Sequence, residues 1–242
     1  MISKVIHYCW FGRKPLPISA KKCIESWKRY CPDYEIIEWN ESNFDVNKNI
    51  YCKEAYEARK FAFVSDYARF EILYKYGGVY FDTDVEILKP IDELLLRGAF
   101  MGVERENPIS VAPGLGMAAH PGLSIFKEFI DSYNQRSFKL ENGKLDVTTV
   151  VVTVTNILRK YGLRNSNEIQ FIAGISIYPV EYFCPKNIDT GEIKISSNTY
   201  TIHHYDGSWL DNKGKIKNVI KVVIGKTFGE KIVKIIRNRL WK

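Results

Sequence analysis

The chain lacks two features that would place it outside the cell or in a membrane. Its 242 residues include five cysteines, an odd number, and none of them forms a Cys-x-x-Cys pair. This argues against a disulfide framework or a zinc site and indicates reduced thiols in a cytoplasm. The segment Met1–Gly12 contains Lys4 and His7 and no uninterrupted apolar stretch. We therefore expect no secretory signal and, because no later apolar run is long enough, no membrane-spanning helix.

Acidic side chains are scarce at one end of the chain. Residues 213–242 contain eight lysines and two arginines against the single acid Glu230, a net charge of +9. Because the whole chain carries +7, the other 212 residues carry a net charge of −2. The body of the protein is thus nearly neutral, and no known nucleic-acid-binding motif occurs in it, so a nucleic-acid partner is not predicted.

The basic segment 213–242 has the pattern of two amphipathic helices. In residues 228–242 the apolar side chains share one side of a helical wheel and most cations the other, and the preceding stretch repeats the scheme. Such helices can lay their apolar faces into a membrane interface while the cations meet anionic lipid heads. The alternative that these faces pack on the rest of the protein stays open. We expect one domain over 1–212 and a basic amphipathic helical tail over 213–242.

Strand and helix patterns alternate along the first 212 residues. Helices are predicted at 18–30, 52–76, 122–134 and 147–161, with a short one after Pro90. Strands are predicted at 4–10, 34–39, 79–81, 100–103, 169–178 and 200–204. Gly77-Gly78 should end the helical pattern that covers Phe61–Tyr76. The alternation predicts an α/β layer architecture with a mainly parallel sheet.

Two carboxylates, Asp82 and Asp84, directly follow the apolar strand Val79–Phe81. In open α/β sheets, ligands gather at the carboxyl ends of the strands. Two carboxylates one residue apart offer hard oxygen ligands that suit Mg²⁺ or Mn²⁺. A divalent ion at this place can bridge the phosphates of a nucleoside diphosphate and offset the charge on a leaving group.

Three other binding motifs can be checked against the sequence, two of them at the Asp-x-Asp segment and one near the end of the chain. A calcium EF-hand loop needs glycine where Ile87 stands and would include Pro90, so it is excluded. A phosphatase of the haloacid-dehalogenase type usually continues Gly-Thr, whereas Val85-Glu86 follows here. Gly225-Lys226-Thr227 resembles the end of a P-loop, but the required earlier glycine is Ile220. An Asp-x-Asp phosphatase, and a non-catalytic protein that binds nucleic acid or membrane through the basic tail, remain the alternative functions.

The helical segment Phe61–Tyr76 carries two charges on an otherwise apolar pattern. It has apolar or aromatic residues on almost every side, so we expect it to be largely buried. Asp66 and Arg69 are costly to bury unless they are paired or hold a ligand. The three-residue spacing allows a simple ion pair on one helix face as well as a ligand site, and both interpretations stay open.

Together, the motifs of this chain resemble a known family. Ser65-Asp66-x-x-Arg69 followed by Gly77-Gly78-Val79-Tyr80-Phe81-Asp82-Thr83-Asp84 is similar to the DXD-containing core of glycosyltransferase family 32. That family includes yeast-type α-mannosyltransferases and many bacterial capsule and lipopolysaccharide enzymes, and the clostridial glucosylating toxins share its core. The likeness extends to the segments Ile6–Gly12 and His203–Trp209.

The resemblance implies a fold, a reaction and a setting. The fold is GT-A, a Rossmann-like nucleotide-sugar-binding domain. The reaction transfers a hexose, with retention of configuration, from a nucleotide-sugar donor, UDP-linked rather than GDP-linked, to a glycan or lipid-linked glycan acceptor. It runs as a same-face displacement through an oxocarbenium-like transition state, with Mn²⁺ or Mg²⁺ as cofactor. The setting is surface polysaccharide synthesis in a bacterial cytoplasm, with the tail as peripheral anchor at the inner face of the membrane.

The resemblance also implies roles for individual residues. Trp10 stacks on the nucleotide base, and Asp66 and Arg69 hold the donor sugar and the ribose–phosphate region. Tyr80 packs beside the donor. Asp82 contacts donor hydroxyls and the water shell of the metal, and Asp84 binds the metal directly. The catalytic residues expected are thus Asp66, Arg69, Asp82 and Asp84.

The late segment supplies the remaining candidates. His203 and His204 end a strand pattern, so their side chains should face opposite ways. The spacing of His204 and Gly207 resembles the metal-binding histidine of other GT-A families, which implies His204 as a ligand and His203 as a packed or capping histidine. Ser208 and Trp209 contact the diphosphate and close over the donor.

One stretch departs from the family. Residues 112–119 are rich in proline, glycine and alanine, whereas many relatives carry polar side chains there. This leaves the sugar and the acceptor contacts open. Asp146, Thr148 and Thr149 could contact an acceptor, although the start of a solvated helix is the simpler interpretation.

Overall fold

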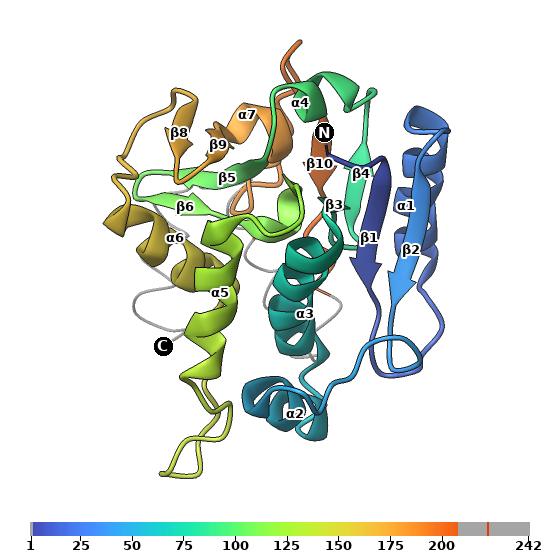
Figure 1. The fold of residues 1–242 in the computed structure, drawn as a ribbon. Coiled ribbons are helices and arrows are strands. Elements are labelled where there is room, and N and C mark those ends of the chain that lie inside the picture. Colours follow the sequence, from blue (N-terminus) through green and yellow to red (C-terminus); the bar gives the residue numbers. More distant parts are fainter. Residues whose placement is uncertain (1, 208–221, 223–242) are drawn as a thin grey trace.

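A mixed sheet forms the centre of the computed structural model, which describes residues 2–207 and residue 222 (Figure 1). Its strands run in the order β2-β1-β3-β7-β5-β9-β8, and β6 pairs with β5 off this path. Their bounds are β1 (Val5–Cys9), β2 (Glu35–Trp39), β3 (Gly78–Tyr80), β5 (Phe100–Glu106), β6 (Ile109–Val111), β7 (Met117–Ala119), β8 (Gln170–Ile172) and β9 (Ile175–Tyr178).

The parallel pairing that the sequence predicts is present in a mixed sheet, where three strand pairs of the described residues are parallel and four are antiparallel. Strand β1 pairs in parallel with both β2 and β3, and β5 pairs in parallel with β9. The antiparallel strand β7 joins these two parts, because it pairs with β3 on one side and β5 on the other. Strand β8 adds an antiparallel edge next to β9. The α/β fold class is therefore confirmed.

Helices cover both faces of the sheet. Their bounds are α1 (Ile18–Tyr30), α2 (Ile50–Glu57), α3 (Phe61–Tyr76), α4 (Asp92–Leu96), α5 (Ser124–Asn134), α6 (Val150–Lys160) and α7 (Val180–Phe183), with a 3₁₀ turn at Pro113–Leu115. Figure 1 shows α3 and α5 side by side, and Phe70 of α3 packs against Phe126 and Phe129 of α5. On the other face, Trp27 of α1 packs against Tyr8 of β1. One strand can contact helices on both faces of the sheet, because its successive side chains point to opposite faces.

Helix α3 ends where the sequence predicts. Gly77 and Gly78 follow it, and both have positive φ angles, 67° and 93°. A Cβ at Gly78 would lie 2.7 Å from the carbonyl oxygen of Val5, so the chain turns from helix to strand only with glycine here. Strand β3 therefore starts beside β1, and its carboxyl end leads to Asp82 and Asp84.

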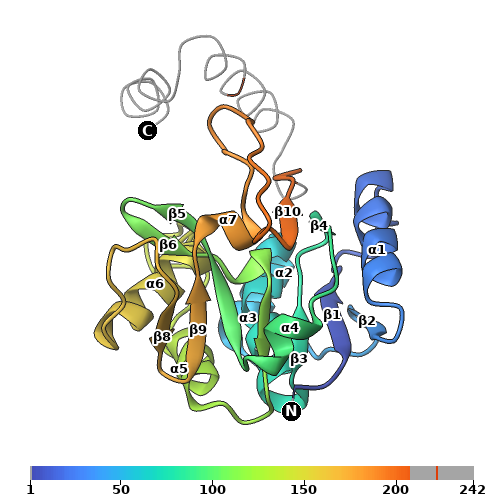
Figure 2. The ribbon, with the colours of Figure 1, turned by 90° about the horizontal axis from the view of Figure 1, so that it is seen from above.

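A second, two-stranded sheet was not predicted. Strand β4 (Val85–Ile87) pairs antiparallel with β10 (Thr201–His203), with His203 opposite Val85. Figure 2 shows these two strands between α1 and α7. On the α1 side, Trp27 Nε1 donates to the Val85 carbonyl at 2.7 Å. This pairing brings the end of β10 to the Asp-x-Asp motif.

Some predictions fall outside the described residues. They concern Ser208, Trp209 and the basic tail 213–242, of which only residue 222 is described, so the boundary at residue 212 and the tail helices stay predictions. Within the described part of the chain, no helix is long and apolar enough to cross a membrane. The five cysteines are buried and unpaired.

Candidate functional site

The Asp-x-Asp motif lies at the carboxyl ends of β1 and β3. The Phe81 amide donates to the His7 carbonyl at 3.2 Å, which continues the parallel pairing past the end of β3. The Asp82 amide then donates to the carbonyl of Gly114 in the 3₁₀ turn at 3.0 Å. Asp82 is thus held by its backbone between two parts of the sheet, and 31% of its side chain is exposed.

Arg69 joins the charges of this site. Its Nη2 lies 3.0 Å from Asp66 Oδ1 and 3.2 Å from Asp82 Oδ1, and its Nε donates to the Ser65 carbonyl at 3.0 Å. The guanidinium lies over the Tyr80 ring, 4.9 Å from its centroid. The Tyr80 hydroxyl donates to Asp82 Oδ1 at 3.0 Å. One buried cation therefore holds two carboxylates, of which Asp82 reaches solvent.

The electrostatics of this cluster follow from burial. Burial raises the pKa of Asp66 to about 6, against the opposing effect of Arg69, and the Val150 amide at the start of α6 donates to its carboxylate. Burial lowers the pKa of Arg69, but Asp82, Tyr80 and Asp66 together raise it above its usual value. Arg69 therefore stays charged, and Asp66 is anchored at a helix N-terminus.

The ion-pair interpretation of Asp66 and Arg69 is confirmed. The pair along the helix joins Arg69 Nη2 to Asp66 Oδ1. It also extends to Asp82, which an ion pair that only stabilises α3 does not require. Asp66 and Arg69 thus form one cluster with Tyr80 and Asp82, and their role in ligand binding stays a prediction.

Asp84 is surrounded by the late segment of the chain. Its Oδ1 lies 3.1 Å from His203 Nε2, and its Oδ2 accepts from the Asp206 amide at 3.0 Å. The His204 amide donates to the Asp84 carbonyl at 2.9 Å. These contacts hold the pKa of Asp84 below its usual value although burial acts to raise it. The Asp84 side chain is therefore in its deprotonated, negatively charged form at neutral pH.

The two histidines face opposite ways, as predicted, but the one that faces Asp84 is His203 and not the expected His204. His203 faces Asp84, while His204 Nε2 lies 2.8 Å from Glu86 Oε2. The reason is the register of β10 against β4, which places His203 opposite Val85 and turns its side chain to the Asp84 side. His203, and not His204, therefore adjoins Asp84. The alternation of side chains along a strand predicts only that the two histidines face opposite ways, and not which of them faces Asp84.

A divalent ion fits Asp84 and His203. Their facing atoms are 3.1 Å apart, close to the roughly 3 Å between adjacent ligands of an octahedral ion held at about 2.1 Å. No group of three or more His, Cys, Asp or Glu side chains that could hold a metal occurs in the described part of the chain. Asp82, Asp84 and His204, the predicted set, thus do not form one cluster. Two protein ligands suit an ion whose other ligands are phosphate and water.

Trp10 lines a hollow at the ends of β1 and β2. The hollow has a volume of about 690 Å³, and its other lining residues are Arg13, Lys14, Pro15, Glu38, Asn40, Glu41 and Ser42. Trp10 Nε1 donates to the Lys14 carbonyl at 2.6 Å, which fixes the ring. Glu41 accepts from the Gly12 amide at 2.7 Å. A half-exposed indole beside polar and charged groups can take up a planar base with its attached sugar.

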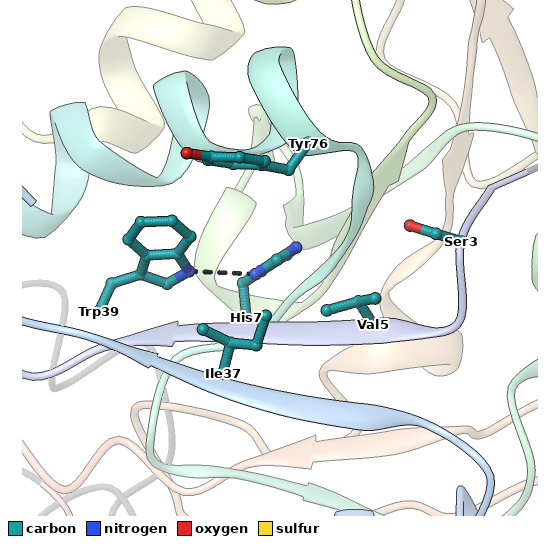
Figure 3. Close-up of a pocket in the computed structure, with 6 residues that line it drawn as sticks. All are labelled: Ser3, Val5, His7, Ile37, Trp39 and Tyr76. Carbon is teal, nitrogen blue, oxygen red and sulfur yellow. Dashed lines mark hydrogen bonds between the residues drawn. The ribbon is translucent and has the colours of Figure 1, made fainter. Parts of the chain in front are cut away.

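A second hollow, of about 390 Å³, lies over one face of these strands (Figure 3). His7, Trp39 and Tyr76 line it together with Ser3, Val5 and Ile37. Tyr76 is the last residue of α3 and precedes β3, whereas Asp82 follows β3. His7 accepts from Trp39 Nε1 and faces the Gly77 carbonyl, both at 3.0 Å. Its ring nitrogens are therefore satisfied, and this hollow adds nothing to the Asp82 site.

The residues considered as acceptor contacts have structural roles. Thr149 is the N-cap of α6, and its side chain accepts from the Val152 amide. Asp146 accepts two hydrogen bonds from Arg136, at 2.6 and 3.0 Å, and one from the Thr148 amide. This matches the start of a solvated helix.

Residues 17–101 match the model of the family described as a glycosyltransferase sugar-binding region containing a DXD motif. The chain is 31% identical over 150 residues to inositol phosphoceramide mannosyltransferase 1 of Schizosaccharomyces pombe, covering 57% of this chain and 45% of that protein. It is 24% identical over 162 residues to human lactosylceramide 4-alpha-galactosyltransferase, covering 58% of this chain and 40% of that one.

A solved structure shows the same fold. The PaToxG glycosyltransferase superposes with a TM-score of 0.50 at 19% identity, over 66% of this chain and 69% of that chain. The chain spans less than half the length of the two curated relatives named above. The family model covers residues 17–101, which include Asp82 and Asp84.

Proposed function

We propose that this chain, which carries the DXD-containing sugar-binding region of the glycosyltransferases in residues 17–101, is a metal-dependent retaining glycosyltransferase. It moves a hexose from a nucleoside diphosphate sugar to a hydroxyl of a glycan. The observation that carries the proposal is the meeting of two clusters at the ends of β1 and β3. One is Arg69 with Asp66, Asp82 and Tyr80, and the other is Asp84 with His203.

The two clusters suit the two halves of the donor. Asp82 exposes part of its carboxylate beside Arg69, so it can accept hydrogen bonds from sugar hydroxyls while Arg69 keeps it oriented. Asp66 stays behind Arg69 and is 11% exposed, so it acts mainly by fixing the guanidinium. Trp10, at the neighbouring hollow, offers its ring to the nucleotide base.

Asp84 and His203 would hold the divalent ion, Mn²⁺ or Mg²⁺. When bound, such an ion neutralises the diphosphate and thereby helps it to leave. Asp84 is already an anion, and the Asp206 amide and the His203 ring fix its orientation. This preorganisation means that little rearrangement is needed as charge develops in the transition state.

The acceptor and the setting are further parts of the proposal. The two relatives named above are, by their names, transferases that act on inositol phosphoceramide and on lactosylceramide. They support an acceptor that is a sugar attached to a lipid. We propose such a lipid-linked glycan for this chain, with UDP-hexose as donor and surface polysaccharide as the product. The enzyme would work in the cytoplasm, at the inner face of a bacterial membrane.

A thermal-shift panel tests the reaction class. UDP-glucose, UDP-galactose, GDP-mannose, UDP and GDP are each added with Mn²⁺ or with a chelator. A ligand that binds only the folded state raises the melting temperature in proportion to its occupancy. We expect a Mn²⁺-dependent rise for the nucleotides of one base, and no such rise in Asp84→Ala, which should melt near the wild type. A panel without any shift, or shifts that chelation leaves unchanged, would contradict the proposal.

A further inference from the structure

Gly114 lies directly against the carboxylate of Asp82. A Cβ on Gly114 would stand 1.9 Å from Asp82 Oδ2, 2.7 Å from its Cγ and 3.3 Å from Arg69 Nη1. Gly114 does not have a positive φ angle, unlike the nearby Gly116 at 145°. Glycine is therefore required at position 114 for space, and not for an unusual backbone conformation.

We propose that Gly114 is a positioning residue that turns the Asp82 carboxylate toward Arg69 and Tyr80, and that it thereby sets the affinity for the sugar half of the donor. The part about the donor rests on the proposed function. The contact between Gly114 and Asp82 does not, because it can be measured in the protein without any ligand.

The contacts of Asp82 explain why a methyl group at position 114 matters. The backbone amide of Asp82 donates to the Gly114 carbonyl, so the two residues are fixed relative to each other. Its Oδ1 accepts from Tyr80 at 3.0 Å and pairs with Arg69 at 3.2 Å. A methyl group on residue 114 occupies the place of Oδ2, and the carboxylate must rotate about its χ angles. Rotation breaks both contacts of Oδ1 and leaves Arg69 paired with Asp66 alone.

The Asp84 cluster is independent of this contact. Asp84 is held by His203 and by the Asp206 amide, and none of the groups that a Cβ on Gly114 meets belongs to that set. A change at Gly114 should therefore affect the recognition of the two halves of the donor differently. Recognition of the sugar is lost, whereas recognition of the metal and diphosphate is kept.

The first experiment measures two affinities in Gly114→Ala by titration calorimetry with Mn²⁺. The ligands are the nucleotide sugar that stabilises the wild type most and its nucleoside diphosphate. We expect the nucleoside diphosphate to bind within about twofold of wild type and the nucleotide sugar to bind about tenfold or more weakly, as for a lost hydrogen bond to a charged group. The matched control is Gly102→Ala, whose Cβ meets Phe183 at 2.9 Å in the core. It should lower the melting temperature and leave both affinities unchanged.

The second experiment is a double-mutant cycle on melting temperature without ligand, with Gly114→Ala, Asp82→Ala and the double variant. If the two residues touch as described, the double variant melts like Asp82→Ala, because the clash disappears with the carboxylate. Additive losses overturn the contact. Equal weakening of both ligands in Gly114→Ala, or normal binding of both, overturns the role in sugar recognition. If the wild type binds no nucleotide sugar, both the proposed function and the proposed role of Gly114 in donor recognition are wrong. The double-mutant cycle still tests the contact between Gly114 and Asp82 in that case.

Discussion

Arg69 is the residue on which the charges of the site converge. Its side chain is 4% exposed and faces two carboxylates, Asp66 and Asp82. A buried ion pair is weak grounds for stability, because desolvation can offset the Coulomb attraction. The partial exposure of Asp82 is the informative feature, because it leaves part of the carboxylate accessible, as the proposed contact with donor hydroxyls requires.

The adjacent histidines allow a matched comparison at the residue scale. His203 Nε2 faces Asp84 Oδ1, and His204 Nε2 faces Glu86. We expect His203→Ala to raise the Mn²⁺ concentration needed for half-maximal nucleotide binding by tenfold or more, in the range of about 10–100-fold seen when a metal site loses a supporting group. His204→Ala, one residue away and of equal size change, should shift it by less than about twofold.

The measurement is Mn²⁺ titration at fixed nucleotide, read by calorimetry, with the melting temperature of each variant as a check on folding. The opposite ranking, with His204→Ala the more damaging change, would support the assignment made from the sequence spacing. It would also show that β10 shifts its register against β4 when the ion binds.

At the scale of elements, the local signals in the sequence were sufficient for the first half of the site. The glycine end of α3 lies where it was predicted and the strand before Asp82 lies within one residue of its predicted bounds, because both have strong short-range patterns. The helix predicted over 52–76 is divided into α2 and α3. The pairing of strands β4 and β10 could not be predicted from such local signals. They are three residues each, and their partners lie more than a hundred residues apart in the chain, so no local period reveals their pairing.

The same limit explains the two residues that the sequence analysis placed incompletely. Alternation predicted that His203 and His204 face apart, but the register that decides between them belongs to the pairing with β4. Gly114 lies in a stretch recognised only as unusually rich in small residues. What makes it matter is the approach of Asp82 from another part of the chain, which only the folded structure contains.

His7 ties three elements together and gives the fold a pH dependence. Its ring accepts from Trp39 at the end of β2 and donates to the Gly77 carbonyl after α3. Burial lowers its pKa to about 4 from the usual 6.5. Between these values the unfolded chain takes up a proton that the folded chain does not. The stability is therefore full above pH 6.5 and falls as the pH drops toward 4, by on the order of 3 kcal/mol.

The test compares urea unfolding of the wild type and of His7→Gln between pH 7 and pH 4. We expect the wild type to lose about 3 kcal/mol more than the variant over this range. Asp66 acts in the opposite direction, since its raised pKa makes the folded state bind a proton first as the pH falls. Its contribution is common to both proteins and cancels in the difference. Parallel pH curves for the two proteins would show that His7 can be protonated inside the fold.

At the scale of the whole molecule, the site is assembled from distant parts of the sequence. Asp66 and Arg69 come from α3, Asp82 and Asp84 from the end of β3, and His203 from β10. The matched family region ends at residue 101, so it contains the Asp-x-Asp motif and not the histidine. The family region thus contains Asp66, Arg69 and Asp82, but neither His203 nor the Gly114 carbonyl that accepts from the Asp82 amide.

The basic tail raises the last question at this scale, whether the protein attaches to a membrane. Residues 213–242 carry a net charge of +9, and all of them except residue 222 lie outside the described residues. Each cation near an anionic surface contributes on the order of 1 kcal/mol, and the contribution falls with salt. We expect the full chain to float with vesicles that contain phosphatidylserine at low salt, and to be released at high salt. The chain truncated before Lys213 should stay at the bottom of the gradient.

The control for this experiment is the folding of the truncated chain, followed by its melting temperature and its nucleotide shift. If truncation leaves both unchanged and abolishes flotation, the tail is a membrane anchor and a lipid-linked acceptor gains support, because the anchor holds the active site where that acceptor lies. If the truncated chain melts much earlier, the apolar faces of the tail pack on the catalytic domain. Vesicles of neutral lipid separate charge from apolar insertion, since a helix bound mainly by its cations does not float with them.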